Sequence, residues 1–350
     1  MNECTRASGC LHPDHAGEIL YFREGRVYSV QIESNTDCPQ GCRYCYAATG
    51  DGGKELPRSA VLRVIESAVR MGVRAVDWLG GDPLIRRDWY EIMKYAAGRG
   101  LTNNIWSSGM PLQIRAHAKR AVEVSEGGFI AVHLDSLNPE IYGRMHTGDP
   151  ERQIEAVLKG VDNLLHLGKR PEHLINCVTF TKPLAGEDLE ETIRYFAEEK
   201  GMRTCLTQLC MVGLAEKHPE WVPGAGEIKE ACETRDRYSL KDSGLSISTM
   251  DVTKFYCGGT ICVTVDGDVT PCSVIRKGFG NIHASLLEEI VDRHRDELLF
   301  MPLRNGNAPG YCSRCENNPI CWGCRATAYY AHGDLLGEDP TCWRNSRHDR

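Results

Sequence analysis

Short strand-like runs alternate with amphipathic helical segments through more than half of this 350-residue chain. The runs are rich in β-branched and aromatic residues, and the segments between them carry apolar residues at helical spacing. This alternation predicts an α/β fold in which a parallel sheet is wound with right-handed crossovers, as a partial or complete barrel of six β/α units, and we expect the partial (β/α)6 form. The predicted strands are 27–33, 75–80, 103–108, 129–136, 174–181 and 204–212. The predicted helices are 57–71, 86–98, 112–124, 150–167 and 187–200.

A change in composition after about residue 250 predicts a second, C-terminal module. Cysteines become dense there, and VTVDGDVTPC is typical of a hairpin that turns at Asp266 and Gly267. One helix-like stretch, 284–300, interrupts the module. We therefore predict an N-terminal extension (1–26), a barrel core (27–215), a linker (216–250) and a cysteine-rich domain (251–350).

Composition and charge narrow the function classes. Apolar residues make up 41% of the chain and charged residues 25%, and no apolar run approaches a membrane span of about 18 residues. The N-terminus lacks the apolar core of a secretory signal, which predicts a reducing, cytoplasmic location. A net charge of −7 without a basic stripe argues against a nucleic-acid partner. We expect neither a membrane nor a nucleic acid as partner.

Seventeen cysteines, an odd number, point to metal binding. Cys38, Cys42 and Cys45 lie within eight residues, directly after the first predicted strand, where barrels of this kind carry their chemistry. A structural zinc site uses four protein ligands, whereas three thiolates suit a four-iron cluster with one open iron. The alternatives are a zinc knuckle completed by a distant His or Cys, and three unrelated core cysteines.

The spacing CxxxCxxC, with Tyr44 before the third cysteine, resembles that of the radical S-adenosylmethionine (SAM) enzymes, whose core is a partial TIM-like barrel. The resemblance implies that Cys38, Cys42 and Cys45 hold a [4Fe-4S] cluster whose open iron binds SAM, and that Tyr44 lies at the SAM site. In that family an electron donor such as flavodoxin or ferredoxin reduces the cluster. SAM is then cleaved to methionine and a 5′-deoxyadenosyl radical that abstracts a substrate hydrogen.

A second motif, LGGDP, ends the second predicted strand. The family usually carries GGEP there, so the resemblance implies that Gly80, Gly81, Asp82 and Pro83 contact SAM, with Asp82 one methylene shorter than the usual Glu. Glycines at a strand end permit close backbone approach. A Gly-Gly-Asp-Pro turn by itself is common, so the motif depends on its position after the cysteine loop.

The next two strands end in weaker candidates. Ser107 and Ser108 follow the third strand, where the family often places polar contacts to SAM, although ordinary strand-ending hydroxyls are an equal alternative. Asp135 follows the fourth strand, and alternation puts His133 on the same face. Asp135 is a candidate SAM contact, and His133 and Asp135 are weak candidates for catalysis. A satisfied histidine inside the barrel is the alternative for His133.

The C-terminal cysteine spacing resembles the SPASM domain, which carries two auxiliary [4Fe-4S] clusters. The family pattern assigns Cys257, Cys262, Cys272 and Cys324 to the first cluster, and Cys312, Cys315, Cys321 and Cys342 to the second. The spacing between Cys321 and Cys324 is one residue shorter than usual. A pair of zinc ribbons is the alternative. Fully ligated auxiliary clusters imply electron transfer, which favours a net oxidation.

The six remaining cysteines have no assigned role. Cys177 and Cys205 fall in predicted strands and are expected to be small buried residues, although a thiol that donates hydrogen to a substrate radical is an alternative. Cys4 and Cys10, with His12 and His15, look metal-capable, but a frayed N-terminus is the favoured interpretation. The other two are Cys210 and Cys232.

The resemblance leaves the substrate open between two classes. Relatives with this auxiliary domain modify or crosslink peptides and proteins, whereas others oxidise or decarboxylate small molecules such as tetrapyrroles, aminosugars or cyclitols. Only 37 residues precede Cys38, which argues against a fused leader-binding domain. A peptide would then be presented by a separate recognition protein or bind the barrel directly. A non-catalytic iron-sulfur electron carrier is the alternative to an enzyme.

Overall fold

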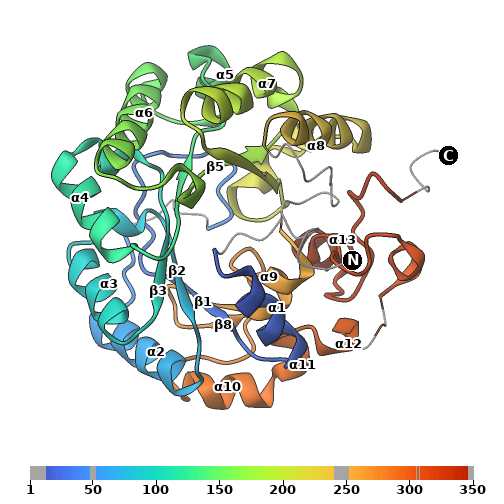
Figure 1. The fold of residues 1–350 in the computed structure, drawn as a ribbon. Coiled ribbons are helices and arrows are strands. Elements are labelled where there is room, and N and C mark those ends of the chain that lie inside the picture. The colour runs from blue at the N-terminus through green and yellow to red at the C-terminus, as the bar shows by residue number, and fades with distance from the viewer. Residues whose placement is uncertain (1–12, 48–52, 240–251, 305, 307, 346–350) are drawn as a thin grey trace.

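The computed structural model describes residues 13–47, 53–239, 252–304, 306 and 308–345. Its centre is a sheet of eight strands in the order β6-β5-β4-β3-β2-β1-β7-β8. The first six strands pair in parallel with their chain neighbours and curve into a partial barrel, which confirms the predicted fold class (Figure 1). These strands are β1 (Ser29–Glu33), β2 (Ala75–Leu79), β3 (Thr102–Trp106), β4 (Ile130–His133), β5 (Leu174–Phe180) and β6 (Arg203–Gln208).

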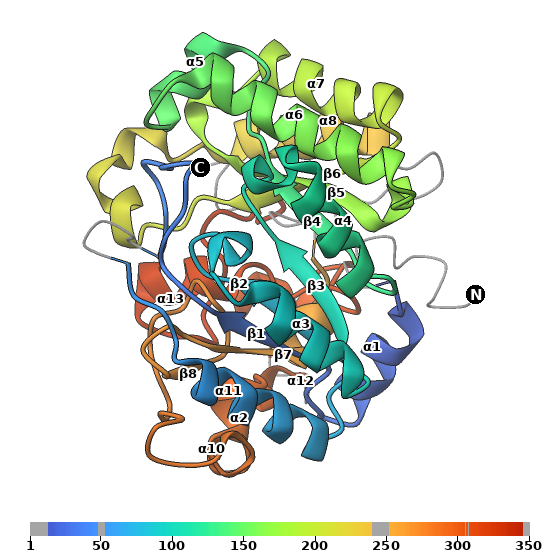
Figure 2. The ribbon, with the colours of Figure 1, turned by 90° about the vertical axis from the view of Figure 1, so that its left-hand side faces the viewer.

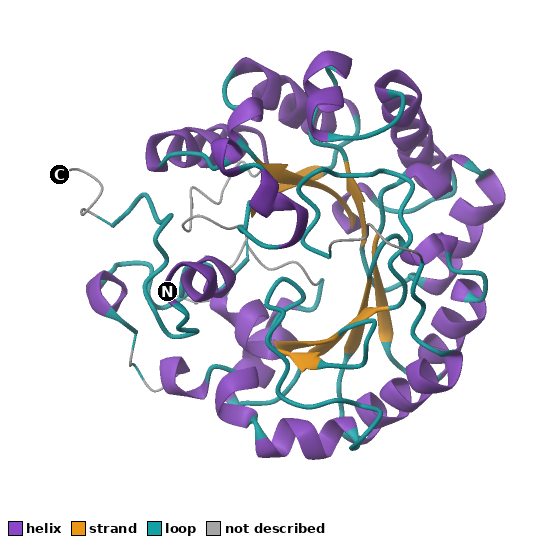
Figure 3. Cartoon of the chain, turned by 180° about the vertical axis from the view of Figure 1, so that it is seen from behind, coloured by secondary structure: helices purple, strands orange, loops and turns teal. Residues whose placement is uncertain are grey.

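The five predicted crossover helices form an outer ring around the strands (Figure 3). They are α2 (Arg58–Arg70), α3 (Trp89–Gly98), α4 (Arg115–Val124), α6 (Pro150–His166) and α7 (Glu187–Arg194). Pro150 occupies the first turn of α6, where its missing N–H costs nothing, and the Asp149 side chain caps that helix by accepting from the Arg152 amide at 3.2 Å.

The described residues contain further helices besides the five crossover helices. The barrel region adds α1 (His15–Arg23), α5 (Pro139–Met145) and α8 (Ala225–Ser239), and the C-terminal region contains α9 (Lys254–Gly259), α10 (Leu287–Arg293), α11 (Arg295–Leu298), α12 (Met301–Arg304) and α13 (Arg325–His332). Helix α8 packs against α7 and β6, so part of the predicted linker completes the outer ring. The predicted helical stretch 284–300 is divided at His294, within the run DRHRDE, which offers no apolar side chain for packing.

The C-terminal region joins the barrel through its own strands. β7 (Thr260–Val263) pairs in parallel with β1, and β8 (Val269–Thr270) returns antiparallel to β7 (Figure 2). The predicted turn is confirmed, because Gly267 has a φ of +86°, which favours glycine. The hydroxyls of Ser29 and Thr260 are 2.8 Å apart across the new strand pair. One edge of the barrel is therefore continuous with the cysteine-rich region.

The two faces of the sheet differ in chemistry. Val76 and Trp78 on β2 belong to the large apolar core under the helices. Asp77, between them, points to the opposite face, where it accepts from the Asn104 side chain at 2.7 Å and from the Ser29 hydroxyl at 3.3 Å. The barrel interior thus contains buried polar groups that are satisfied by one another. Among the described residues, no helix has the length and apolar character needed to cross a membrane.

Candidate active site

The cysteine loop follows β1 and is held against the end of β2 by two backbone hydrogen bonds. The amide of Gly81 donates to the Asn35 carbonyl at 2.7 Å, and the amide of Asp82 donates to the Asp37 carbonyl at 2.6 Å. A Cβ on Gly81 would lie 1.9 Å from the Asp37 oxygen, and one on Gly80 would lie 2.3 Å from the Asn35 oxygen. The two glycines are therefore required for the cysteine loop to approach this strand.

Two thiols of this loop, those of Cys38 and Cys42, lie in a desolvated environment. Cys42 lies within electrostatic range of both Cys38 and Cys45. Burial raises the pKa of Cys38 to about 12 and raises the pKa of Cys42 well above its usual value. Thiolates form at such positions when a bound cation offsets the loss of water. Together with Cys45 in the same loop, these thiols fit an iron-sulfur cluster.

Asp82 turns its buried carboxylate toward the end of the third strand. One oxygen accepts from the Ser107 hydroxyl at 2.8 Å, from the Ser108 amide at 2.9 Å and from the Ser108 hydroxyl at 2.6 Å. The other accepts from the Leu84 amide at 3.0 Å and so caps the short turn that begins at Pro83. Burial raises the pKa of Asp82, although these donors oppose the shift. The structure therefore brings Asp82, Ser107 and Ser108 together as one unit.

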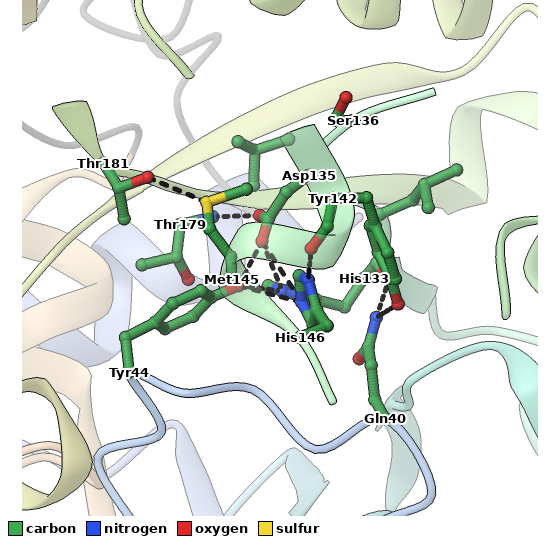
Figure 4. A network of polar contacts seen from close by, with 12 residues as sticks. Gln40, Tyr44, His133, Asp135, Ser136, Tyr142, Met145, His146, Thr179 and Thr181 are labelled. Atoms are coloured by element: carbon green, nitrogen blue, oxygen red, sulfur yellow. Dashed lines mark hydrogen bonds and ion pairs between the residues drawn. The ribbon is translucent and has the colours of Figure 1, made fainter. Parts of the chain in front are cut away.

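A second network surrounds Asp135 (Figure 4). The Tyr44 hydroxyl donates to Asp135 and lies 2.7 Å from Nε2 of His133, and the Thr179 amide donates to the other carboxylate oxygen at 2.9 Å. Nε2 of His133 and Nε2 of His146 lie 3.3 Å and 3.4 Å from Asp135. Burial disfavours the ionised form of Asp135, but His133, His146 and Tyr44 outweigh it and hold its pKa below the usual value. Asp135 thus anchors the cysteine loop to β4.

His146 belongs to this network, and sequence reasoning did not identify it. Its ring stacks on Tyr142 with centroids 3.9 Å apart, and burial lowers its pKa to about 4, so it is neutral near pH 7. It forms a backbone bridge with Cys42. Ligand atoms of Cys42, His133 and His146 lie within 4.8 Å of one another. His146 follows the short helix α5, and no local pattern marks that position.

An ion pair connects the barrel to the C-terminal region beside the cysteine loop. The Arg276 guanidinium donates to both oxygens of Glu33, at 2.5 Å and 3.1 Å, and the Val265 amide donates to the same carboxylate at 3.3 Å. Glu33 is only 2% exposed. Tyr46, next to Cys45 in the chain, lies close to this pair, and burial together with Glu33 raises the pKa of its phenol.

The C-terminal cysteines lie close to one another in the structure. Cys257 has Cys272, Cys324 and Cys321 as electrostatic neighbours, and Cys262 has Cys272. Cys312 and Cys342 both neighbour Cys321, and Cys312 also neighbours Cys315. Burial raises the pKa of Cys272 and Cys312 to about 11 and that of Cys342 to about 12. These desolvated thiols have the donor chemistry of metal sites. Because Cys257 also neighbours Cys321, which belongs to the other predicted set, the division into two sets of four stays a prediction.

The cysteines without a predicted role fall in different places. Cys177 and Cys205 are paired in register on β5 and β6 and are buried, as predicted. Cys210 lies just beyond β6 and is buried in an apolar cluster together with Cys324. Cys4, Cys10 and His12 lie outside the described residues.

Comparison with known families decides the identity. The family model of the radical SAM superfamily matches residues 32–205, and the SPASM iron-sulfur cluster-binding domain matches residues 255–316. The chain belongs to the radical SAM superfamily. It is a radical SAM enzyme with a C-terminal SPASM domain, a family whose cofactors are SAM and [4Fe-4S] clusters.

Curated radical SAM relatives differ in the share of length that they match. A probable GTP 3′,8-cyclase of Methanosarcina acetivorans is 32% identical over 172 residues, 47% of this chain, and the chain spans only half of that relative. The AdoMet-dependent heme synthase of Methanosarcina barkeri is 26% identical over 89% of this chain and 95% of its own. The PqqA peptide cyclase of Rhizobium meliloti is 25% identical over 89% of this chain and 86% of its own.

A solved structure shares most of this fold. Streptococcus suis SuiB, determined with its precursor peptide SuiA, superposes with a TM-score of 0.64 over 93% of this chain and 79% of its own, at 16% identity. At that identity the similarity establishes the fold alone.

Proposed function

We propose that this radical SAM enzyme carries out an oxidative modification or crosslinking of a peptide, initiated by reductive cleavage of SAM. The observation that carries the proposal is the loop of Cys38, Cys42 and Cys45 at the C-terminal rim of the barrel, in which Cys38 and Cys42 are desolvated. When bound there, a [4Fe-4S] cluster and SAM supply a 5′-deoxyadenosyl radical that removes a substrate hydrogen. The electron would come from a donor of the flavodoxin or ferredoxin class.

The residues around the loop would position the cofactor. Gly80 and Gly81 allow the loop to close on β2, so the turn from Gly80 to Pro83 would lie beside SAM. Asp82 is engaged by Ser107 and Ser108, which supports a role in shaping the SAM site. A rigid rim keeps the reacting atoms in place for hydrogen abstraction.

Tyr44 and Asp135 would act on the loop from the other side. Their hydrogen bond fixes the loop on β4, so we propose that Asp135 positions the cysteines and that Tyr44 contributes to the SAM site through this contact. His133 is the more accessible member of this network, with a side chain 19% exposed compared with 0% for Asp135. It is therefore the candidate that faces a substrate.

We further propose that eight cysteines of the C-terminal region hold two auxiliary [4Fe-4S] clusters, which gives three clusters in the chain. Each of the two predicted sets offers four thiols, one for every iron. Clusters ligated in this way exchange electrons without binding substrate. They would accept the electron that leaves the substrate radical, and this favours a net oxidation.

A peptide substrate is supported by two relatives that match most of the chain. One is named a peptide cyclase, and the other was determined with a precursor peptide. The heme synthase relative matches an equal share of the chain and supports the second candidate, oxidation of a small molecule such as a tetrapyrrole. A separate peptide-recognition protein would fit the first candidate.

Deuterium transfer tests the proposal and separates the two substrate classes. The reconstituted enzyme is incubated with SAM, a reductant and either a deuterated peptide library or deuterated tetrapyrroles, and 5′-deoxyadenosine is analysed by mass spectrometry. Deuterium from a peptide supports the proposal, and deuterium only from the tetrapyrrole favours the second candidate. If 5′-deoxyadenosine is not formed with any substrate, the enzymatic proposal is wrong.

A further inference from the structure

Cys210 is a cysteine outside both predicted auxiliary sets, yet it lies against one of their members. A hydrogen bond joins the thiols of Cys210 and Cys324, and Cys272 is a further electrostatic neighbour. Cys210 and Cys324 belong to one buried apolar cluster, against which Cys272 also packs. Cys210 is 7% exposed and Cys324 is 4% exposed. Three thiols from distant parts of the sequence therefore meet in one buried place.

The backbone holds Cys210 at this position. Its carbonyl accepts from the Val212 amide at 2.8 Å, and the chain then turns at Gly213, where φ is +65°. A Cβ on Gly213 would lie 2.7 Å from the carbonyl oxygens of Cys45 and Tyr46. The segment is therefore fixed against the cysteine loop at one end and against Cys324 at the other.

The distance between the Cys210 and Cys324 thiols suits two sulfur atoms that can reach the same metal ion. Two thiolates on one tetrahedral metal ion lie roughly 3.8 Å apart when each metal–sulfur bond is about 2.3 Å, which is also the range of a sulfur hydrogen bond. Each iron of a four-iron cluster accepts one external ligand. Two thiols in direct contact are thus placed to serve the same iron as alternatives.

We propose that Cys210 is a fifth thiol of the first auxiliary cluster and takes the iron that Cys324 otherwise holds. This inference rests on the proposed cluster of Cys257, Cys262, Cys272 and Cys324. The iron keeps a thiolate ligand whichever of the two cysteines is bound. Cys257, Cys262 and Cys272 keep their irons in either case.

Iron content of single and double variants tests the inference. The full chain is reconstituted anaerobically as wild type, Cys324→Ala, Cys210→Ala, the Cys210→Ala/Cys324→Ala double variant and a matched Cys205→Ala/Cys324→Ala control. Cys205 is suited to the control because it is also a buried cysteine that is hydrogen-bonded to another cysteine, Cys177. Iron and sulfide are quantified and the clusters are compared by Mössbauer spectroscopy.

The inference predicts about twelve irons per chain in the wild type, in both single variants and in the control, and about eight in the Cys210→Ala/Cys324→Ala variant. About eight irons in Cys324→Ala alone would overturn it while leaving the proposed clusters intact. About four irons in the wild type would overturn the auxiliary clusters and the inference together.

A second measurement removes the dependence on folding of the variants, since Cys324 also begins α13 by accepting from the Thr327 amide at 3.5 Å. Iron-free wild type is treated with oxidised glutathione, which accepts the two electrons released when two thiols lose their protons and form a disulfide. Peptide mapping is expected to find a bond between Cys210 and Cys324. Pairing of either cysteine mainly with another partner would contradict the inference.

Discussion

The amide of Leu214 donates a hydrogen bond of 3.0 Å to the carbonyl of Cys45. Leu214 lies only four residues after Cys210, whose thiol contacts Cys324. One short segment beyond β6 therefore touches both the loop with the three predicted ligands of the SAM cluster and a predicted ligand of an auxiliary cluster. Because this segment contacts both sites, a structural change at the auxiliary cluster is expected to alter the conformation of the loop that carries the SAM cluster, and the reverse.

Replacing Gly81 tests the fit between the cysteine loop and β2. In Gly81→Ala the new Cβ meets backbone atoms of Asp37 and Thr36, which cannot rotate away as a side chain could, so the loop must move. We expect a loss of about 2–4 kcal/mol in the free energy of unfolding and a reduced iron content. Urea unfolding and iron analysis measure both effects.

Gly98→Ala is the matched control, because a Cβ at the end of α3 meets no atom within 4 Å. It is expected to keep wild-type stability and iron. Equal behaviour of the two variants would show that Gly81 is not needed for close approach.

Removing the Tyr44 hydroxyl tests the anchor on Asp135. Tyr44→Phe leaves a buried carboxylate without its shortest contact, so we expect about 1.5–3 kcal/mol of destabilisation and slower SAM cleavage at unchanged iron content. Tyr90→Phe is the control: it removes an exposed hydrogen bond in which the Tyr90 hydroxyl donates to Glu123, and it should change neither stability nor SAM cleavage. Wild-type stability and SAM cleavage in Tyr44→Phe would rule out the anchoring role.

The Glu33–Arg276 pair is expected to stabilise the junction between the barrel and the C-terminal region. Arg276→Met leaves the buried Glu33 without its counter-ion and should lower the free energy of unfolding by about 2–3 kcal/mol. The loss is expected to be smaller than for a fully buried pair, because the Arg276 side chain is 30% exposed. Lys54→Met breaks the exposed pair with Asp266 and should have little effect. Equal effects in denaturant titrations would contradict this assignment.

Lys169 predicts a pH effect at the opposite end of the barrel. Burial lowers its pKa to about 8, whereas the unfolded chain keeps a value of about 10.4. Between these values the unfolded state binds more protons, so the contribution of Lys169 to the free energy of unfolding rises with pH. The difference between wild type and Lys169→Met should therefore increase from pH 8 to 10 in urea titrations. A constant difference would show that Lys169 keeps its ordinary pKa.

Sequence reasoning predicted the six barrel strands and five crossover helices because their periodicity is local. It missed α5, which is seven residues long, and α8, which follows the last predicted strand. The pairing of β7 with β1 joins residues more than 200 positions apart, and no local pattern encodes such contacts.

In the candidate site, too, local motifs were predictable from the sequence and contacts between distant segments were not. The motifs placed the cysteines and LGGDP, and the structure adds that Asp82 is bound by Ser107 and Ser108. His146 and Cys210 acquire their neighbours only when distant segments meet, so neither was predictable from spacing.

The central claim is tested most directly by formation of 5′-deoxyadenosine from SAM. Anaerobically reconstituted protein is given dithionite and SAM beside a Cys42→Ala variant, with iron quantified in both. We expect product from the wild type at about twelve irons per chain, and loss of about four irons and of the product in Cys42→Ala. Product formation that is unchanged in Cys42→Ala would contradict the assignment of this loop as the site of SAM cleavage.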